Sequence, residues 1–329
     1  MRRSPLLAVP ALALVLTACG GSGSDDSGKP EVVAAFYPYA WAAEQVGGDL
    51  VDISSLTSPG VEAHDLELTA KQVASVQDAD VVIYQRQFQA AVDDAVERAG
   101  RDEGTTLDVA ETVEMLDAPE GAHTHSHEEE GHDHAEGEDE HAHEEEGHEG
   151  HDHDHGDTDP HLWLDPTNME KVVAAVADQL AEVDPDHADE YAANAEAVTG
   201  QLADLDRTFS TTLAKCERRT FVTSHAAFAY LAHKYDLEQI SIAGIDPSNE
   251  PSAAQLAAIS DEVNEEGVTT IFTERLVSPA VAETVARQTG ATTAVLDPLE
   301  GLSDETSQET YLTIMDANLD ALATANGCA

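Results

Sequence analysis

The chain has 329 residues, with 15 Lys or Arg against 66 Asp or Glu and a formal net charge of −51. This balance argues against nucleic acid as a partner, because a phosphate backbone is bound by a basic surface. It is compatible with a cationic ligand, although a solvated acidic surface is the more common cause of such a charge.

Residues 1–18 predict an export signal. After a basic start, residues 5–16 form an apolar run that is too short for a permanent membrane span. The following Leu16-Thr-Ala-Cys19 resembles the lipobox of bacterial lipoproteins, in which the cysteine carries lipid; an ordinary signal peptide with a chance cysteine is the alternative. We therefore expect an extracytoplasmic protein anchored to the cell membrane by lipidated Cys19, with residues 19–30 as its tether.

Cysteine use agrees with export. Once Cys19 is set aside, Cys216 and Cys328 remain, and two cysteines in an oxidising compartment suggest one disulfide. Two free thiols are the alternative. Neither cysteine has a neighbouring Cys or His at zinc-finger spacing, so neither is expected to bind a metal.

Residues 31–186 predict an N-terminal α/β lobe. A helix is expected to begin at a capping box formed by Thr69 and Gln72. Strands that alternate with helices favour a parallel sheet covered on both faces. The β-like runs of this region lie at residues 31–36, 51–56 and 81–84.

The segment from Ala118 to Asp159 contains 17 acidic residues, 11 histidines and no Lys or Arg. It offers almost nothing apolar to bury, so we expect a disordered insertion at residues 118–158. Its histidines predict auxiliary, low-affinity metal binding that collects the metal or senses a surplus; a solubilising segment that binds metal incidentally is the alternative. These histidines are His123, His125, His127, His132, His134, His141, His143, His148, His151, His153 and His155.

A long helix is predicted over residues 187–215. The helix before it is expected to start at a capping box of Thr167 and Glu170. A helix of this length between two α/β regions is expected to join two lobes. Its apolar residues recur every three or four positions and form one continuous stripe, namely Tyr191, Ala195, Val198, Leu202, Leu205, Phe209 and Leu213.

Residues 216–329 repeat the strand and helix pattern and predict a C-terminal α/β lobe. One of its helices is expected to begin at a capping box of Ser252 and Gln255. The predicted fold class is therefore α/β, with two lobes that contain parallel sheets and are joined by one long rigid helix. The β-like runs of this lobe lie at residues 221–223, 269–273 and 292–296.

Three histidines outside the insertion lie where predicted strands lead into loops. His64 and His225 follow β-like runs, and His161 lies between two prolines just before a helix. Asp297 follows the last β-like run. Ligands of open α/β sheets bind beyond the carboxyl ends of the strands, so we expect these four side chains to converge in the cleft between the lobes.

Three imidazoles and one carboxylate suit Zn²⁺, which takes four ligands in a tetrahedron. The excess of imidazole favours zinc over Mn²⁺ or Fe²⁺, since harder ions prefer carboxylate. For each histidine a structural or surface role stays open. Asp297, in its Leu-Asp-Pro turn, is alternatively a cap of that turn.

The segments around these residues resemble those of the cluster A-I metal-binding proteins of ABC importers, specifically the zinc-binding ZnuA type. The resemblance covers roughly residues 31–326 and implies two α/β lobes joined by one long helix. In that family a histidine at the third ligand position, here His225, marks the zinc-type members. In some members water or a glutamate near the first histidine is the fourth ligand, so Glu62 stays an alternative to Asp297. The matching segments are Pro59-Gly-Val-Glu-Ala-His64-Asp, Asp159-Pro-His161-Leu-Trp-Leu-Asp-Pro, Val222-Thr-Ser-His225-Ala-Ala-Phe-Ala-Tyr230 and Val295-Leu-Asp297-Pro-Leu.

The resemblance implies a receptor that binds Zn²⁺ and delivers it to the permease of an ABC importer; we expect it to be monomeric. A manganese or iron receptor of the same family and a surface zinc buffer or adhesin are alternatives. A zinc hydrolase is a further alternative, but it needs an open coordination position and a general base. The sequence has no His-Glu-x-x-His or serine nucleophile motif, so we expect no enzymatic activity.

Overall fold

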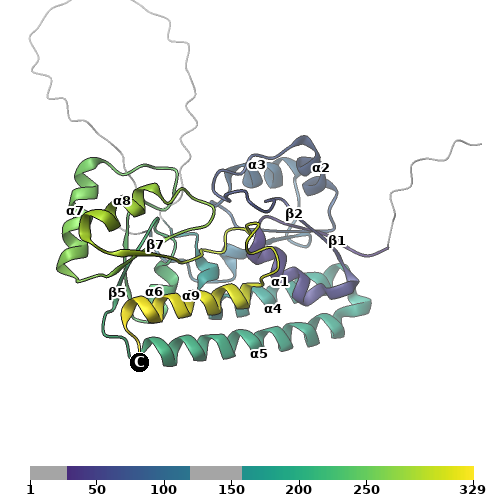
Figure 1. Cartoon of the computed structure of the whole chain (residues 1–329). Helices are drawn as coiled ribbons and strands as arrows, with labels where there is room; N and C mark the ends of the chain where they lie inside the picture. Colours follow the sequence, from purple (N-terminus) through teal and green to yellow (C-terminus); the bar gives the residue numbers. More distant parts are fainter. Residues whose placement is uncertain (1–27, 119–157) are drawn as a thin grey trace, which may run out of the picture.

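The computed structural model describes residues 28–118 and 158–329. The predicted export signal, Cys19 and the histidines of the insertion lie outside these described residues. The chain forms two α/β halves, each built on a four-stranded parallel sheet, with one long helix running along both (Figure 1). The predicted fold class is therefore confirmed. Within the described ranges, no helix is long and apolar enough to cross a membrane.

The first half contains a sheet with the strand order β2-β1-β3-β4, in which all neighbours are parallel. Its central strand β3 is buried along its whole length, as its continuous apolar sequence predicts. The strands are β1 (Glu31–Ala34), β2 (Asp52–Ser55), β3 (Val81–Tyr84) and β4 (Thr106–Asp108). The helices beside them are α1 (Tyr37–Gly47), α2 (Ala70–Asp78) and α3 (Ala90–Ala99).

The second half repeats this topology with the strand order β6-β5-β7-β8, again parallel throughout. In both sheets the chain moves first to one side of the starting strand and then to the other, and ligands bind at such a switch point. The strands are β5 (Thr220–Thr223), β6 (Glu238–Ser241), β7 (Thr270–Thr273) and β8 (Thr292–Val295). The helices are α6 (Ala229–Lys234), α7 (Ala253–Glu265) and α8 (Ala280–Thr289).

Two of the three predicted capping boxes are present. The side chain of Thr69 accepts a hydrogen bond from the backbone of Gln72 and that of Gln72 accepts one in return, and Ser252 and Gln255 form the same reciprocal pair. The capping box predicted at Thr167 and Glu170 is wrong. Helix α4 (Pro166–Val183) begins two residues earlier than a cap at Thr167 predicts, because Asp165 caps it through a 2.8 Å hydrogen bond from the Thr167 backbone.

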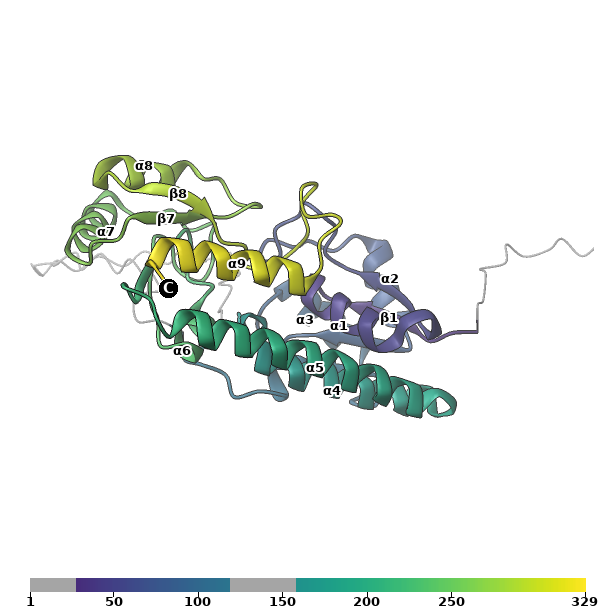
Figure 2. The same ribbon diagram turned by 60° about the horizontal axis from the view of Figure 1, so that its bottom comes forward.

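Three long helices lie beneath the two sheets, one packed mainly against each half and one running along both (Figure 1). They are α4, α5 (Ala188–Leu213) and α9 (Tyr311–Asn326), and α5 packs along α4 and beside α9 (Figures 1 and 2). The apolar stripe predicted along α5 is confirmed, since all seven of its members are buried. The long helix is therefore held along its length by neighbouring helices.

The larger of two hydrophobic clusters extends through both halves, and the smaller lies within the second half. Trp41 of the first half stacks on Tyr311 of α9, with 4.7 Å between ring centroids. The Trp163 indole donates to the carbonyl of Pro298 at 2.7 Å, and the Tyr311 hydroxyl donates to the carbonyl of Trp163 at 2.7 Å. Because these buried contacts join segments from both halves, they restrict how far the halves separate.

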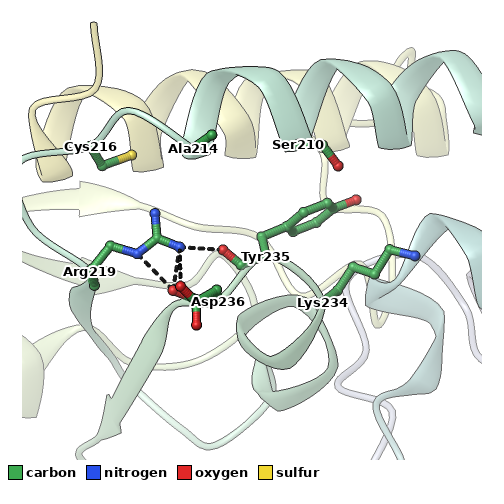
Figure 3. A pocket seen from close by; sticks show the side chains of 7 residues that line it. All are labelled: Ser210, Ala214, Cys216, Arg219, Lys234, Tyr235 and Asp236. Atoms are coloured by element: carbon green, nitrogen blue, oxygen red, sulfur yellow. Dashed lines mark hydrogen bonds and ion pairs between the residues drawn. The ribbon is translucent and has the colours of Figure 1, made fainter.

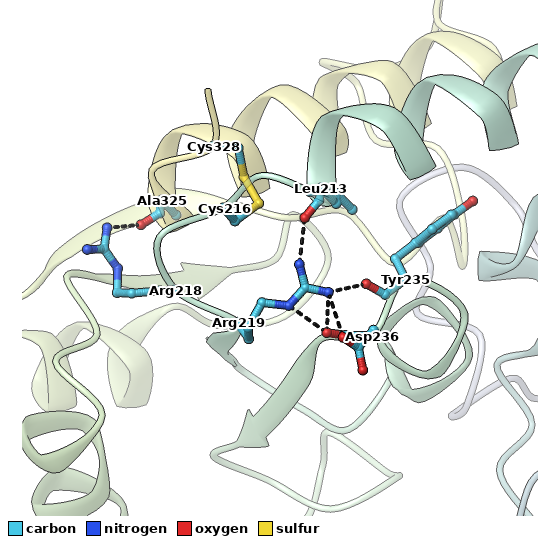
Figure 4. Close-up of a disulfide and its surroundings, with 8 residues drawn as sticks. All are labelled: Leu213, Cys216, Arg218, Arg219, Tyr235, Asp236, Ala325 and Cys328. Atoms are coloured by element: carbon cyan, nitrogen blue, oxygen red, sulfur yellow. Dashed lines mark hydrogen bonds and ion pairs between the residues drawn. A yellow bond between two sulfur atoms is a disulfide. The ribbon is translucent and has the colours of Figure 1, made fainter.

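A disulfide joins Cys216, just after α5, to Cys328, just after α9 (Figure 4). Beside it, Arg219 donates to the carbonyl of Leu213 at the end of α5, at 2.6 Å. Arg218 donates to the carbonyl of Ala325 in the last turn of α9, also at 2.6 Å. The terminal carbonyls of both helices, which have no partner within their own helix, thus find donors next to the disulfide.

A surface pocket lies in the same region, at the end of α5 (Figure 3). Its charged lining side chains already have partners. Arg219 donates to the carbonyls of Tyr235 and Asp236, and Lys234 donates to the Thr167 hydroxyl at 3.1 Å. It contains none of the predicted metal ligands. Its lining consists of Ser210, Ala214, Cys216, Arg219, Lys234, Tyr235 and Asp236.

Replacing both Cys216 and Cys328 by serine is expected to lower the free energy of unfolding by about 2–4 kcal/mol, because the bond restricts the unfolded chain. The two cysteines are 112 positions apart, so the closed loop is long. Urea unfolding of the metal-free protein measures the change, and chemically reduced wild-type protein is the matched control. An unchanged unfolding midpoint would show that the disulfide does not stabilise this fold.

Candidate metal site

His64, His161 and His225 come together with Glu300 between the two halves. One ligand atom from each residue lies within 4.8 Å of the other three. The four side chains are at most 1 % exposed. The structure thus brings together the three predicted histidines, but the carboxylate that joins them belongs to Glu300 rather than to Asp297.

Four of the separations between the ligand atoms are close to those around a tetrahedral ion. Glu300 Oε1 lies 3.4 Å from His64 Nε2, 3.3 Å from His161 Nε2 and 3.1 Å from His225 Nε2. The Nε2 atoms of His64 and His161 are 3.3 Å apart. Zinc ligands at 2.0–2.1 Å in a regular tetrahedron are about 3.3–3.4 Å from one another. These four separations therefore leave room for one zinc-sized ion at the centre.

His64 lies in the loop between β2 and α2, and the buried side chain of Gln89 makes hydrogen bonds to this loop. The Gln89 side-chain amide donates to the carbonyl of Ala63 at 3.0 Å and to the hydroxyl of Thr57 at 3.1 Å. The imidazole of His64 packs edge-on against Phe88, with 4.8 Å between centroids. The loop has no regular secondary structure, so these side-chain contacts set the position of His64.

Glu62, the alternative fourth ligand, shapes the same loop. Its carboxylate accepts hydrogen bonds from the backbone N–H groups of His64 and Asp65, each at 3.1 Å. Burial, and then the negative charge of Glu300, raise the pKa of Glu62 to about 8. Glu62 is not a member of the four-residue group.

His161 is positioned by the residues before it. The carbonyl of Pro160 accepts a 2.7 Å hydrogen bond from Gln85, which directly follows β3. Asp159 accepts a hydrogen bond from the His161 backbone at 2.8 Å, and the same oxygen is 2.8 Å from His161 Nδ1. The ring packs against Trp163, with 5.2 Å between centroids. With Nδ1 engaged by a carboxylate, Nε2 is the nitrogen that faces the other ligands.

His225 and Glu274 follow β5 and β7, the strands on either side of the switch point of the second sheet. The Glu274 carboxylate lies 2.8 Å from His225 Nδ1 and accepts a hydrogen bond from the His225 backbone at 3.2 Å. The carbonyl of His225 accepts from Gln239 at 3.0 Å. Here too, the ring is held through Nδ1 and presents Nε2.

Asp297, the predicted fourth ligand, is used to build the turn that carries Glu300. Its Oδ1 accepts a hydrogen bond from the Leu299 backbone at 2.9 Å, and its Oδ2 is 3.3 Å from Arg275 Nε. Asn318 of α9 bonds both backbone groups of Asp297, at 2.8 and 2.7 Å. Leu299 adopts a left-handed conformation with φ of 58°. This sharp turn brings the side chain three residues after Asp297 into the site.

Sequence reasoning missed Glu300 because nothing in its local pattern marks it. It follows Leu-Asp-Pro-Leu without a motif of its own. The alternative role stated for Asp297, that of a turn cap, is the one the structure shows. Glu300 lies only five residues after the end of β8, so its position near a strand end is the one signal in the sequence that points to it.

The electrostatics of the group favour positive charge at its centre. Burial alone would lower the pKa of His225, but the Glu274 and Glu300 carboxylates outweigh it and raise the pKa well above its usual range. Burial would raise the pKa of Glu300, but His225 and His64 hold it well below its ordinary value. Burial lowers the pKa of His64. An ionised Glu300 facing three imidazoles is a donor set that suits Zn²⁺.

The sequence of this chain is similar to those of known proteins. The chain is 37 % identical over 327 residues to the high-affinity zinc uptake system protein ZnuA of Bacillus subtilis, covering 97 % of this chain and 96 % of that protein. It is 36 % identical over 328 residues to the zinc-binding lipoprotein AdcA of Streptococcus pneumoniae strain R6, covering 98 % of this chain. The chain spans only 60 % of the length of that AdcA.

Solved structures agree with these relatives. The Zn(II)-bound structure of AdcA from Streptococcus pneumoniae has a TM-score of 0.72 at 31 % identity, covering 91 % of this chain and 58 % of that one. The laminin-binding protein Lmb of Streptococcus agalactiae has a TM-score of 0.72 at 29 % identity, covering 90 % of this chain and 99 % of that one. The family profile described as zinc-uptake complex component A, periplasmic, matches residues 32–325. Since this match spans most of the sequence and includes all four residues of the site, the chain belongs to the ZnuA family.

Proposed function

We propose that this protein is an extracytoplasmic receptor that binds one Zn²⁺ tightly and delivers it to the permease of an ABC importer. The observation that carries the proposal is the buried group of three imidazoles and one carboxylate at tetrahedral separations. Membership of the ZnuA family and the names of the relatives, which describe zinc binding and zinc uptake, support the same cargo.

The donor set supports capture rather than catalysis. Four protein ligands complete a zinc shell, whereas a catalytic zinc keeps one position open for water or substrate. Three imidazoles also favour zinc over manganese, which prefers oxygen ligands. The protein is therefore a binding receptor, as the family and its relatives are, and zinc is its cargo.

The site draws its ligands from both halves of the molecule. His64 and His161 come from the first half, and His225 and Glu300 come from the second. The backbone N–H of Gly60 also donates to the carbonyl of Leu302 at 2.7 Å, which joins the loops that carry His64 and Glu300. A bound ion would make two metal–ligand bonds to each half and so link the halves. Release to the permease therefore requires the ligands of one half to move away from the ion.

Two further parts of the proposal concern location and supply. Lipidation of Cys19 would hold the receptor at the membrane, which the lipobox-like sequence and the name of the AdcA lipoprotein support. The His-rich insertion would collect zinc close to the site. Asp117 and Thr158 pair as an antiparallel bridge, so the two ends of the insertion meet directly before Asp159, the partner of His161.

Zinc titration of a variant in which a short flexible linker replaces residues 119–157 tests the central claim. Because Asp117 and Thr158 already pair, the linker has only a short gap to close. We expect one tight zinc per molecule in isothermal titration calorimetry. His161→Ala and His225→Ala in the same background should abolish tight binding, because each leaves only three ligands. A variant with no tight site, or one that prefers Mn²⁺ in direct competition, would refute the proposal.

The choice between Glu300 and Asp297 is tested by a matched pair of substitutions. Glu300→Gln removes the charge that faces the ion, so we expect zinc affinity to fall by more than the roughly 10–100-fold typical of losing an outer partner of a ligand. Asp297→Asn keeps an oxygen for the Leu299 backbone and should change affinity far less. Competition with a zinc chelator measures both. The reverse order of effects would restore Asp297 as the fourth ligand.

Zinc affinity is expected to fall as the pH falls, because protons compete with the ion for the imidazoles. The pKa of His225 is raised well above its usual range, so this competition should extend above the ordinary histidine pKa of about 6.5. Chelator competition between about pH 6 and about pH 8 measures the slope. Calorimetry in buffers of different ionisation enthalpy should show net proton release on binding. Affinity that is constant over this range would contradict the expectation.

A further inference from the structure

We infer that Asp159 and Glu274 are positioning residues for the bound ion, each holding one histidine so that its Nε2 faces the metal. This inference rests on the proposed function, since the ion they serve is the zinc proposed above. Neither residue is among the four ligands, and each acts through the histidine it contacts.

The two carboxylates make the same pair of contacts. Asp159 Oδ1 is 2.8 Å from the backbone nitrogen and 2.8 Å from Nδ1 of His161. Glu274 Oε1 is 3.2 Å from the backbone nitrogen and 2.8 Å from Nδ1 of His225. An acceptor at this place requires a proton on Nδ1, which leaves the lone pair of the neutral ring on Nε2. The contact thus selects the tautomer and the ring orientation that bind a metal.

The chain reaches this arrangement by two unrelated routes. Asp159 is two residues before its histidine, whereas Glu274 is 49 positions from His225 and belongs to a different strand end. One such pair lies in each half of the molecule. A local sequence preference would not produce both pairs, but a requirement for a fixed imidazole on each side of the ion would.

Burying these two carboxylates costs desolvation free energy, so their burial points to a role in the site. The side chains of Asp159 and Glu274 are 0 % and 2 % exposed. Asp159 Oδ2 has no hydrogen-bond partner among the described residues, and both oxygens of Glu274 lie 2.8 Å from His225 Nδ1. A buried ion pair often stabilises a fold no better than apolar side chains of similar volume. Behind a ligand histidine, however, the charge of the carboxylate makes the imidazole a stronger donor to a cation.

His64 provides an internal comparison. Its Nδ1 is buried and has no hydrogen-bond partner among the described residues, and Phe88 packs against its ring. Burial beside the ion therefore does not by itself bring a carboxylate to every histidine. We expect the affinity for zinc to depend on the carboxylates behind His161 and His225.

The test uses the full chain and competition with a zinc chelator strong enough to report only the tight site. The variants are Asp159→Asn and Glu274→Gln, which keep an acceptor but remove the charge, and Glu274→Met, which removes both. Asp165→Ala is the control, because Asp165 is also buried, caps α4 and contacts none of the ligands. We expect a Kd increase of roughly 10–100-fold for the first two and a larger one for Glu274→Met, with none for the control.

Two readouts separate positioning from a general structural role. The thermal midpoint of the metal-free protein should fall for Asp165→Ala, which loses a helix cap, but little for Glu274→Gln, which keeps an acceptor for both N–H groups of His225. The visible absorption of bound Co²⁺ reports ligand geometry and should change for Asp159→Asn and Glu274→Gln but not for the control. Wild-type affinity and an unchanged Co²⁺ spectrum in these variants would overturn the inference. A lower zinc affinity that comes with a lower thermal midpoint and an unchanged Co²⁺ spectrum would also overturn the inference. If the wild-type protein itself lacked tight zinc binding, the proposed function would be overturned instead.

Discussion

The contact of one buried carboxylate with three buried imidazoles is the interaction on which the rest of this structure depends. Glu300 faces the Nε2 atoms of His64, His161 and His225 at 3.1–3.4 Å, out of reach of solvent. An anion in such a place is unfavourable unless positive charge compensates it. The raised pKa values of His161 and His225 favour protonated imidazoles beside this carboxylate, and a divalent ion would supply the compensating charge more completely. The same electrostatics therefore explain both the stability of the group and its suitability for a cation.

The scaffold explains how four residues distant in sequence meet. Both sheets have the same order of parallel strands, with a switch point between β1 and β3 in one and between β5 and β7 in the other. His225 and Glu274 lie just beyond the ends of neighbouring strands. Gln85, directly after β3, donates a hydrogen bond to the carbonyl of Pro160 and so positions the segment that carries His161. Beneath them, α5 and α9 and the shared aromatic core keep the halves together. The site is thus placed by rigid elements, although the ligands themselves belong to loops.

Residue patterns predicted much of this arrangement because they record burial and local hydrogen bonding. The stripe on α5 and the capping boxes at Thr69 and Ser252 involve residues three or four positions apart, where helix geometry alone determines contact. Helices α1 and α3 were not identified because, unlike the shorter α2, neither begins with a side-chain cap. The edge strands β4 and β6 were not identified because few of their residues are buried. The start of α4 was misplaced because Asp165 and Thr167 are both good caps, and the pattern does not rank them.

The sequence by itself determined the fold class and the position of the long helix, since both follow from periodicity. It also marked the three histidines as candidates, His64 and His225 by their place after β-like runs and His161 by its place between two prolines, and the family resemblance favoured them as ligands. Only the tertiary structure decided that Glu300 rather than Asp297 completes the group. That choice depends on the left-handed turn at Leu299, on the hydrogen bonds of Asn318 to the Asp297 backbone, and on the ion pair of Arg275 with the Asp297 carboxylate. These contacts join residues about 20 positions apart in the chain, and local patterns carry no record of such distances. The pairing of Glu274 with His225 was decided in the same way.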